Sequence, residues 1–90
     1  MERLHAVVEG VVQGVGFRQF TLYQAQRLDL HGWVKNRWDR KVEVIAEGPR
    51  EKLDTLVLAL NRGPAASEVR NVHLNWGQAT GEFTEFTIRH

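Results

Sequence analysis

Hydrophobic residues change their spacing several times along this 90-residue chain, and this succession constrains the fold more than any other sequence feature. Alternating hydrophobic residues are typical of strands with one buried face, and a spacing of three and four is typical of helices. The spacing predicts strands over residues 4–12, 33–36, 41–47, 69–76 and 83–89, and helices over residues 17–30 and about 49–63.

Glycine and proline mark where the two predicted helices begin and end. Gly32 is expected to stop the first helix, because glycine readily adopts the left-handed conformation that follows a helix. Pro49 suits the first position of the second helix, and Gly63-Pro64 ends it. The hydrophobic stripe of this second helix is expected to face the core and consists of Leu53, Leu56, Val57 and Leu60.

The predicted order is therefore βαββαβ with a short extra strand at the C-terminal end. An antiparallel sheet with two helices on one face is the simplest arrangement that covers both helical stripes. This is the ferredoxin-like α+β sandwich, which we expect as a single domain over residues 1–90. Many functions occur on this fold, so the function must be inferred from particular residues.

Composition excludes several classes of function. The chain has no cysteine, which excludes a disulfide scaffold, thiolate zinc sites and a thiol nucleophile. Twelve Lys and Arg against eleven Asp and Glu give a net charge of +1, so an anion site must be local. The four histidines are scattered, and no metal site is expected.

Neither nucleic acid nor a membrane is an expected partner. The two strands that would be central in this fold, residues 4–10 and 42–46, contain no aromatic residue for base stacking. Trp33 and Trp76 are expected in core or hairpin packing, and Trp38 is expected to be exposed. The chain start lacks the apolar segment of a signal peptide, and no apolar run approaches the roughly 20 residues that cross a bilayer. We expect a soluble, cytoplasmic protein.

The loop between the first strand and the first helix is the most informative segment. Gly14 and Gly16 allow positive φ or close approach of a ligand, and a following helix start presents free N–H groups to an anion. Arg18 opposes the helix dipole, and a bound oxyanion would explain its presence there. A solvated arginine beside a flexible turn is the alternative. The loop matches neither a Walker A sequence nor a dinucleotide fingerprint.

Asn36 lies at the end of a predicted strand, where asparagine is unusual. One interpretation is that its side chain starts the following turn. The other is that its amide, which can both donate and accept hydrogen bonds, orients a water molecule.

Together the two segments resemble the signatures of the acylphosphatase family. Residues 8–18, ending in Val12-Gln13-Gly14-Val15-Gly16-Phe17-Arg18, are similar to its first signature. Gly32-Trp33-Val34-Lys35-Asn36, continuing to Val42 and Gly48, is similar to its second. Arg40 stands where that pattern has glycine. If the turn keeps the glycine geometry, Arg40 has a positive φ, unless Asp39 takes the left-handed position instead.

The resemblance implies hydrolysis of the carboxyl–phosphate bond of small acyl phosphates, without metal, cofactor or covalent intermediate. It implies that Arg18 binds the phosphate, that Asn36 positions the attacking water, and that the backbone from Gln13 through Gly14, Val15 and Gly16 to Phe17 forms the phosphate cradle. Inorganic phosphate would be product and competitive inhibitor, and we expect a monomer. The alternative is a non-catalytic small-anion or regulatory binding module on the same fold, which would have no use for Asn36.

Overall fold

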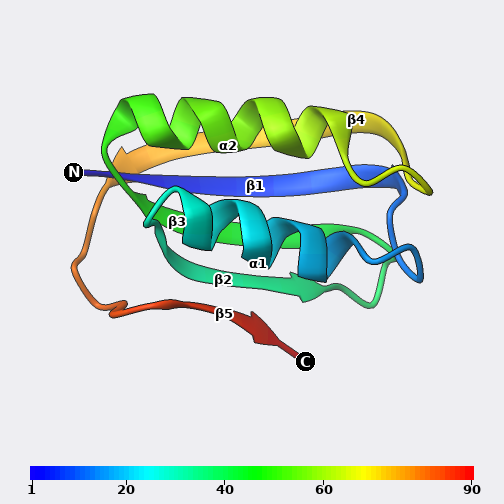
Figure 1. Cartoon of the computed structure of the whole chain (residues 1–90), viewed down its shortest axis with the longest axis horizontal. Helices are drawn as coiled ribbons and strands as arrows, with labels where there is room; N and C mark the ends of the chain where they lie inside the picture. The colour runs from blue at the N-terminus through cyan, green and yellow to red at the C-terminus, as the bar shows by residue number, and fades with distance from the viewer.

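The computed structural model describes all 90 residues and contains two helices and five strands. In chain order these are β1 (Glu2–Val11), α1 (Phe17–Arg27), β2 (His31–Asn36), β3 (Val42–Gly48), α2 (Arg50–Arg62), β4 (Glu68–Gln78) and β5 (Phe86–Arg89). The strands form one sheet in the order β4-β1-β3-β2-β5, and both helices lie on the same face of it (Figure 1). The predicted ferredoxin-like βαββαβ sandwich with an extra C-terminal strand is confirmed.

The sheet is mixed rather than wholly antiparallel, so that part of the prediction is wrong. β1 pairs with β3 and β4, and β2 with β3, in antiparallel fashion, whereas β5 runs parallel to β2. The reason is the route of the chain: β4 finishes at the same end of the sheet at which β2 begins, and the connection runs across that end before β5 starts (Figure 1). The N–H of Gly32 donates to the carbonyl of Glu85 at 3.0 Å on this route.

Glu47 fixes this crossing connection. Its nearly buried carboxylate accepts hydrogen bonds from the Thr80 N–H at 2.8 Å, the Thr80 hydroxyl at 3.0 Å and the Gly81 N–H at 3.1 Å. Burial alone would raise the pKa of Glu47, but these donors together with Arg3 outweigh it and hold the pKa below its usual value. The ionised carboxylate therefore stabilises the path from β4 to β5.

The hydrophobic core lies between the sheet and the two helices. Alternate residues of the neighbouring strands β1 and β3 are fully buried on that face, namely Leu4, Ala6 and Val8 of β1 and Val42, Val44 and Ala46 of β3. α1 contributes Phe17 and Ala25. α2 contributes Leu53, Leu56 and Leu60, with Val57 packed at the margin, as its predicted stripe requires. Burial of each large aliphatic side chain stabilises the fold by about 1.5–3 kcal/mol.

The first helix ends earlier than predicted, and Gly32 does not stop it. α1 ends at Arg27, and Asp29 takes the left-handed conformation with φ 57°. The N–H of Leu30 then donates to Ala25 at 2.9 Å and that of Asp29 to Gln26 at 3.0 Å, which is the Schellman pattern. Gly32 instead lies in β2, where a Cβ atom would come within 1.9 Å of the Ile45 carbonyl oxygen.

The three tryptophans occupy different environments. Trp38 is 93% exposed, as predicted. Trp76 packs against the core, with the Arg50 guanidinium 3.6 Å from its ring centroid. Trp33 fits the hairpin alternative of the prediction, since it lies opposite the buried Ile45 in the β2–β3 hairpin. Its neighbour Val34 faces the helices, so Trp33 lies on the opposite, helix-free face, where Arg89 stacks on its ring at 4.9 Å. No helix is long and apolar enough to span a membrane.

Candidate active site

The loop that joins β1 to α1 is shaped by two left-handed glycines. Gly14 has φ 75° and Gly16 has φ 79°. A Cβ atom on either residue would meet no other atom within 4 Å, so the backbone conformation and not lack of space requires glycine here. Left-handed residues in such a loop turn successive N–H groups toward one point, which makes a concave site for an anion.

The first turn of α1 continues this concave surface. Gly16 is the N-cap residue and supplies no side-chain hydrogen bond, and the first turn contains no acidic residue. The first N–H groups of the helix therefore have no side-chain acceptor, and the positive end of the helix dipole adds to their attraction for an anion.

A cavity of about 210 Å³ lies against this loop. Gly14, Gly16, Phe17 and Arg18 form one part of its wall, Asn36 another, and the C-terminal residue His90 a third. A larger hollow of about 490 Å³ lies at the opposite end of the sheet, beside Gly48, Lys52 and Thr80, and none of the predicted site residues lines it. The structure therefore brings Arg18 and Asn36, 18 positions apart in the sequence, to one cavity.

Asn36 is the last residue of β2, and its side-chain oxygen has no partner. The Oδ1 atom is buried and accepts no hydrogen bond. A buried polar atom without a partner costs about 1–3 kcal/mol, so such atoms are rare, and this oxygen can accept a hydrogen bond from a water or ligand bound in the cavity. The side chain of Asn36 makes no hydrogen bond to the following turn, whose Lys41 N–H lies 3.4 Å from Asp39 Oδ1. The interpretation that Asn36 starts the turn receives no support.

Arg18 faces the cavity from the first turn of α1. Its Nη1 hydrogen bonds to Nδ1 of His90 at 3.2 Å, and it forms no salt bridge with a carboxylate. The charge of the guanidinium is thus available to an anion.

His90 is a residue of the cavity that the sequence does not predict. It reaches the site because β5 pairs with β2 in parallel, Val34 with Ile88 and Lys35 with Arg89, which brings the chain end level with Asn36.

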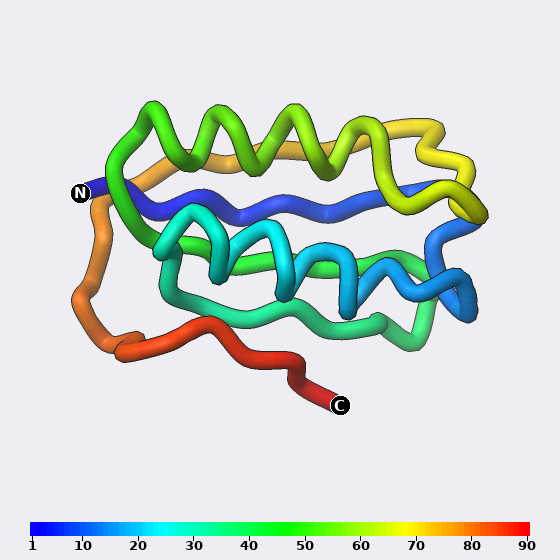
Figure 2. The backbone as a smooth tube through the Cα atoms, in the orientation of Figure 1, coloured from blue at the N-terminus to red at the C-terminus, as the bar shows by residue number.

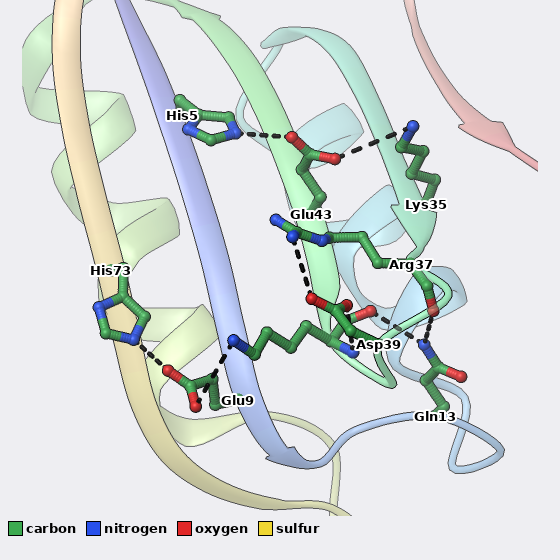
Figure 3. A network of polar contacts seen from close by, with 9 residues as sticks. His5, Glu9, Gln13, Lys35, Arg37, Asp39, Glu43 and His73 are labelled. Atoms are coloured by element: carbon green, nitrogen blue, oxygen red, sulfur yellow. Dashed lines mark hydrogen bonds and ion pairs between the residues drawn. The ribbon is translucent and has the colours of Figure 1, made fainter.

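Two members of the predicted cradle do not line the cavity. Val15 packs its side chain partly against the core. Gln13 turns its side chain toward the β2–β3 hairpin, where Nε2 donates to the carbonyl of Arg37 at 2.8 Å and to that of Lys41 at 2.9 Å (Figure 3). The loop and the hairpin lie side by side at one end of the sheet (Figure 2).

Arg40 occupies the left-handed position of the hairpin turn. Its φ is 69°, whereas Asp39 has no positive φ, so the strained alternative is the one the chain adopts. The turn is closed by the Arg37 N–H, which donates to the Lys41 carbonyl at 2.8 Å, and by the Arg40 N–H, which lies 3.3 Å from the Arg37 carbonyl.

Two histidines on the helix-free face of the sheet hydrogen bond to glutamates, and they form no cluster of metal ligands. His5 pairs with Glu43 at 2.7 Å, and His73 pairs with Glu9 (Figure 3). The hydrogen bond from His73 is the main reason why the pKa of Glu9 lies below its usual value, and Lys41 adds to the effect. No group of three or more His, Cys, Asp or Glu side chains is placed to hold a metal ion.

Comparison with known proteins extends over the whole chain. The family model described as Acylphosphatase matches residues 4–88. An acylphosphatase of Pelotomaculum thermopropionicum is 49% identical over 86 residues, which cover 96% of this chain and 94% of the relative. One of Anaeromyxobacter sp. (strain Fw109-5) is 43% identical over 90 residues, covering 100% and 97%. The crystal structure of acylphosphatase from Bacillus subtilis matches with a TM-score of 0.97 at 38% identity, covering 100% of both chains.

Proposed function

Since this chain belongs to the acylphosphatase family and is an enzyme that hydrolyses acyl phosphates, we propose which of its residues carry out the reaction. Arg18 and the main-chain N–H groups of the loop from Gln13 to Phe17 hold the phosphoryl group. Asn36 positions the water that attacks phosphorus. The acyl carboxylate leaves, and the products are the free carboxylate and inorganic phosphate.

The chemistry of the substrate matches this small set of groups. A carboxylate is a good leaving group, so no strong general acid is needed. Phosphoryl transfer depends mainly on positioning and on stabilising the charge of the equatorial oxygens. The Arg18 guanidinium, which forms no salt bridge with a carboxylate, and the N–H groups at the start of α1, which have no side-chain cap, supply that stabilisation.

The observation that carries the proposal is the buried Oδ1 of Asn36, which has no partner and lies on the same cavity as Arg18. A carboxamide oxygen can accept a hydrogen bond from a water molecule and so turn a water lone pair toward the phosphorus atom. This role satisfies an oxygen that the folded chain leaves unsatisfied. A module that only binds anions would gain nothing from it.

The test is the release of inorganic phosphate from an aromatic acyl phosphate such as benzoyl phosphate. Arg18→Ala should lower kcat/KM by about 10²–10³, as expected on loss of a charge partner of the transition state. Arg70→Ala is the matched control, because Arg70 is an exposed arginine of β4 whose only partner is Glu68. Wild-type turnover in folded Arg18→Ala would refute the assignment.

Asn36→Ala distinguishes the positioning of the water from the binding of the phosphate. It should lower kcat while inhibition by inorganic phosphate stays nearly unchanged, because Asn36 is assigned to the water and Arg18 to the phosphate. Asn75→Ala, which removes the same amide from an exposed position of β4, should change neither quantity. A collapse of phosphate affinity in Asn36→Ala would show that the roles are wrongly divided.

The partner we propose is a small acyl phosphate, with inorganic phosphate as a competitive inhibitor, since the product occupies the same cradle. All residues assigned to the site belong to one chain, where they lie in the loop between β1 and α1, in the first turn of α1 and at the end of β2. This supports an active monomer in which residues 1–90 form one domain.

A further inference from the structure

The two halves of the site come from segments that strand pairing does not join directly. The loop over residues 12–16 follows β1, and Asn36 ends β2, but β3 lies between these strands in the sheet. The sheet links them only indirectly, since Val42 of β3 pairs with Val8 on one side and with Asn36 on the other, and a contact that crosses the start of β3 adds a direct link. Gln13 makes the only hydrogen bonds between residues 12–16 and the hairpin over residues 36–41.

The Gln13 side chain joins both ends of the hairpin turn at once. Its Nε2 carries two hydrogens and donates one to the Arg37 carbonyl at 2.8 Å and the other to the Lys41 carbonyl at 2.9 Å (Figure 3). The same Lys41 carbonyl accepts the Arg37 N–H at 2.8 Å. Arg37 directly follows Asn36, so the bridge holds the peptide unit next to the proposed water-positioning residue.

We propose that Gln13 is a positioning residue, which fixes Asn36 relative to the phosphate held by the loop. The proposal rests on the role given to Asn36 above. Gln13 acts through its side chain on the hairpin, whereas only its main chain belongs to the cradle. A displacement of about 1 Å at a reacting group can lower the rate by about 10²-fold. Loss of the bridge should therefore lower kcat and leave the phosphate cradle intact.

Gln13→Met tests the proposal, because methionine has a similar length and no hydrogen to donate. We expect kcat for benzoyl phosphate to fall by about 10- to 100-fold, with the inhibition constant of inorganic phosphate changed by less than about threefold. Gln24→Met is the matched control. It removes the side-chain hydrogen bond that Arg27 donates to Gln24 at 2.8 Å, in a nearly buried glutamine of the same region of sequence, and should leave kcat unchanged.

A double-mutant cycle with Asn36→Ala separates positioning from a general structural effect. If Gln13 acts through Asn36, Gln13→Met should lower kcat no further once Asn36 is alanine. Equal fold-losses in both backgrounds, or full kcat in Gln13→Met, would overturn the proposal. Full activity of Asn36→Ala would instead refute the proposed function itself, so the two failures are distinguishable.

Amide hydrogen exchange gives a second readout that does not depend on turnover. The Arg37 N–H should exchange at least about tenfold faster in Gln13→Met than in wild type and Gln24→Met, because the hairpin loses its bridge. Unchanged exchange at Arg37 would contradict the proposal. If Gln13→Met does not fold, Gln13→Glu serves in both experiments, because it keeps the shape and its carboxylate has no hydrogen to donate.

Discussion

Replacement of Arg40 by glycine should make the protein more stable. Arg40 has φ 69°, and a residue with a side chain pays about 1–2 kcal/mol for this left-handed conformation. Its exposed side chain makes no hydrogen bond or ion pair, so little is lost with it. Glycine also widens the unfolded ensemble, which costs about 0.4–1 kcal/mol. At the midpoints of these two ranges the difference is a net gain of about 0.8 kcal/mol in the free energy of unfolding.

Urea unfolding at neutral pH measures this difference, and the melting temperature should rise by about 2–8 °C for a domain of this size. Trp38→Gly is the control in the same turn. Trp38 is 93% exposed and has no positive φ, so glycine there relieves no strain and should cost up to about 1 kcal/mol. Equal or lower stability of Arg40→Gly, or stabilisation by both variants, would refute the strain argument. Activity of Arg40→Gly should stay within about tenfold of wild type, which corresponds to less than about 1.4 kcal/mol of barrier.

Three further predictions concern other parts of the chain. Asp29→Gly should raise the free energy of unfolding by about 0.5 kcal/mol in urea, since Asp29 has φ 57° but aspartate tolerates this region better than arginine. Glu47→Gln should lower it by about 1–3 kcal/mol at pH 7. Folding lowers the pKa of Glu47, so its carboxylate stabilises the fold at pH values above the usual glutamate pKa, and this stabilisation is lost as the pH falls through the lowered pKa. The free energy of unfolding should therefore fall less in Glu47→Gln than in wild type when the pH is lowered from 7 into the acidic range. A metal chelator should leave phosphate release unchanged, and activity restored by added metal would contradict the proposed site.

Element types and order could be predicted because they depend on local hydrophobic spacing. The direction of β5 could not, since it depends on where β4 ends relative to β2, which is a property of the assembled sheet. The end of α1 was misplaced for a related reason. Asp29 ends that helix in the left-handed conformation, while Gly32 is required by the close approach of the Ile45 carbonyl on the neighbouring strand.

The residues of the candidate site also differ in whether the sequence predicts them. Arg18 and Asn36 stand out locally, one as a cation at a helix start and the other as an amide at a strand end, and the structure places both on one cavity. His90 carries no such signal, because its position beside Arg18 follows from the parallel pairing of β5 with β2. The contacts of the Gln13 side chain cannot be predicted from the sequence either, since its two acceptors are main-chain carbonyls that any residues could supply.

The bridge from Gln13 also explains how the hairpin accommodates arginine where glycine is usual. A turn defined only by its own residues would relax away from a conformation that costs Arg40 about 1–2 kcal/mol. This turn is instead held from outside by the two hydrogen bonds of Gln13 and from within by Asp39, whose carboxylate pairs with Arg37 at 3.0 Å. Strain persists where the surrounding contacts determine the backbone more strongly than the local residue does. The position of Asn36 therefore depends on the bridge more than on the residue at position 40, and the departure from the glycine pattern is compatible with an intact site.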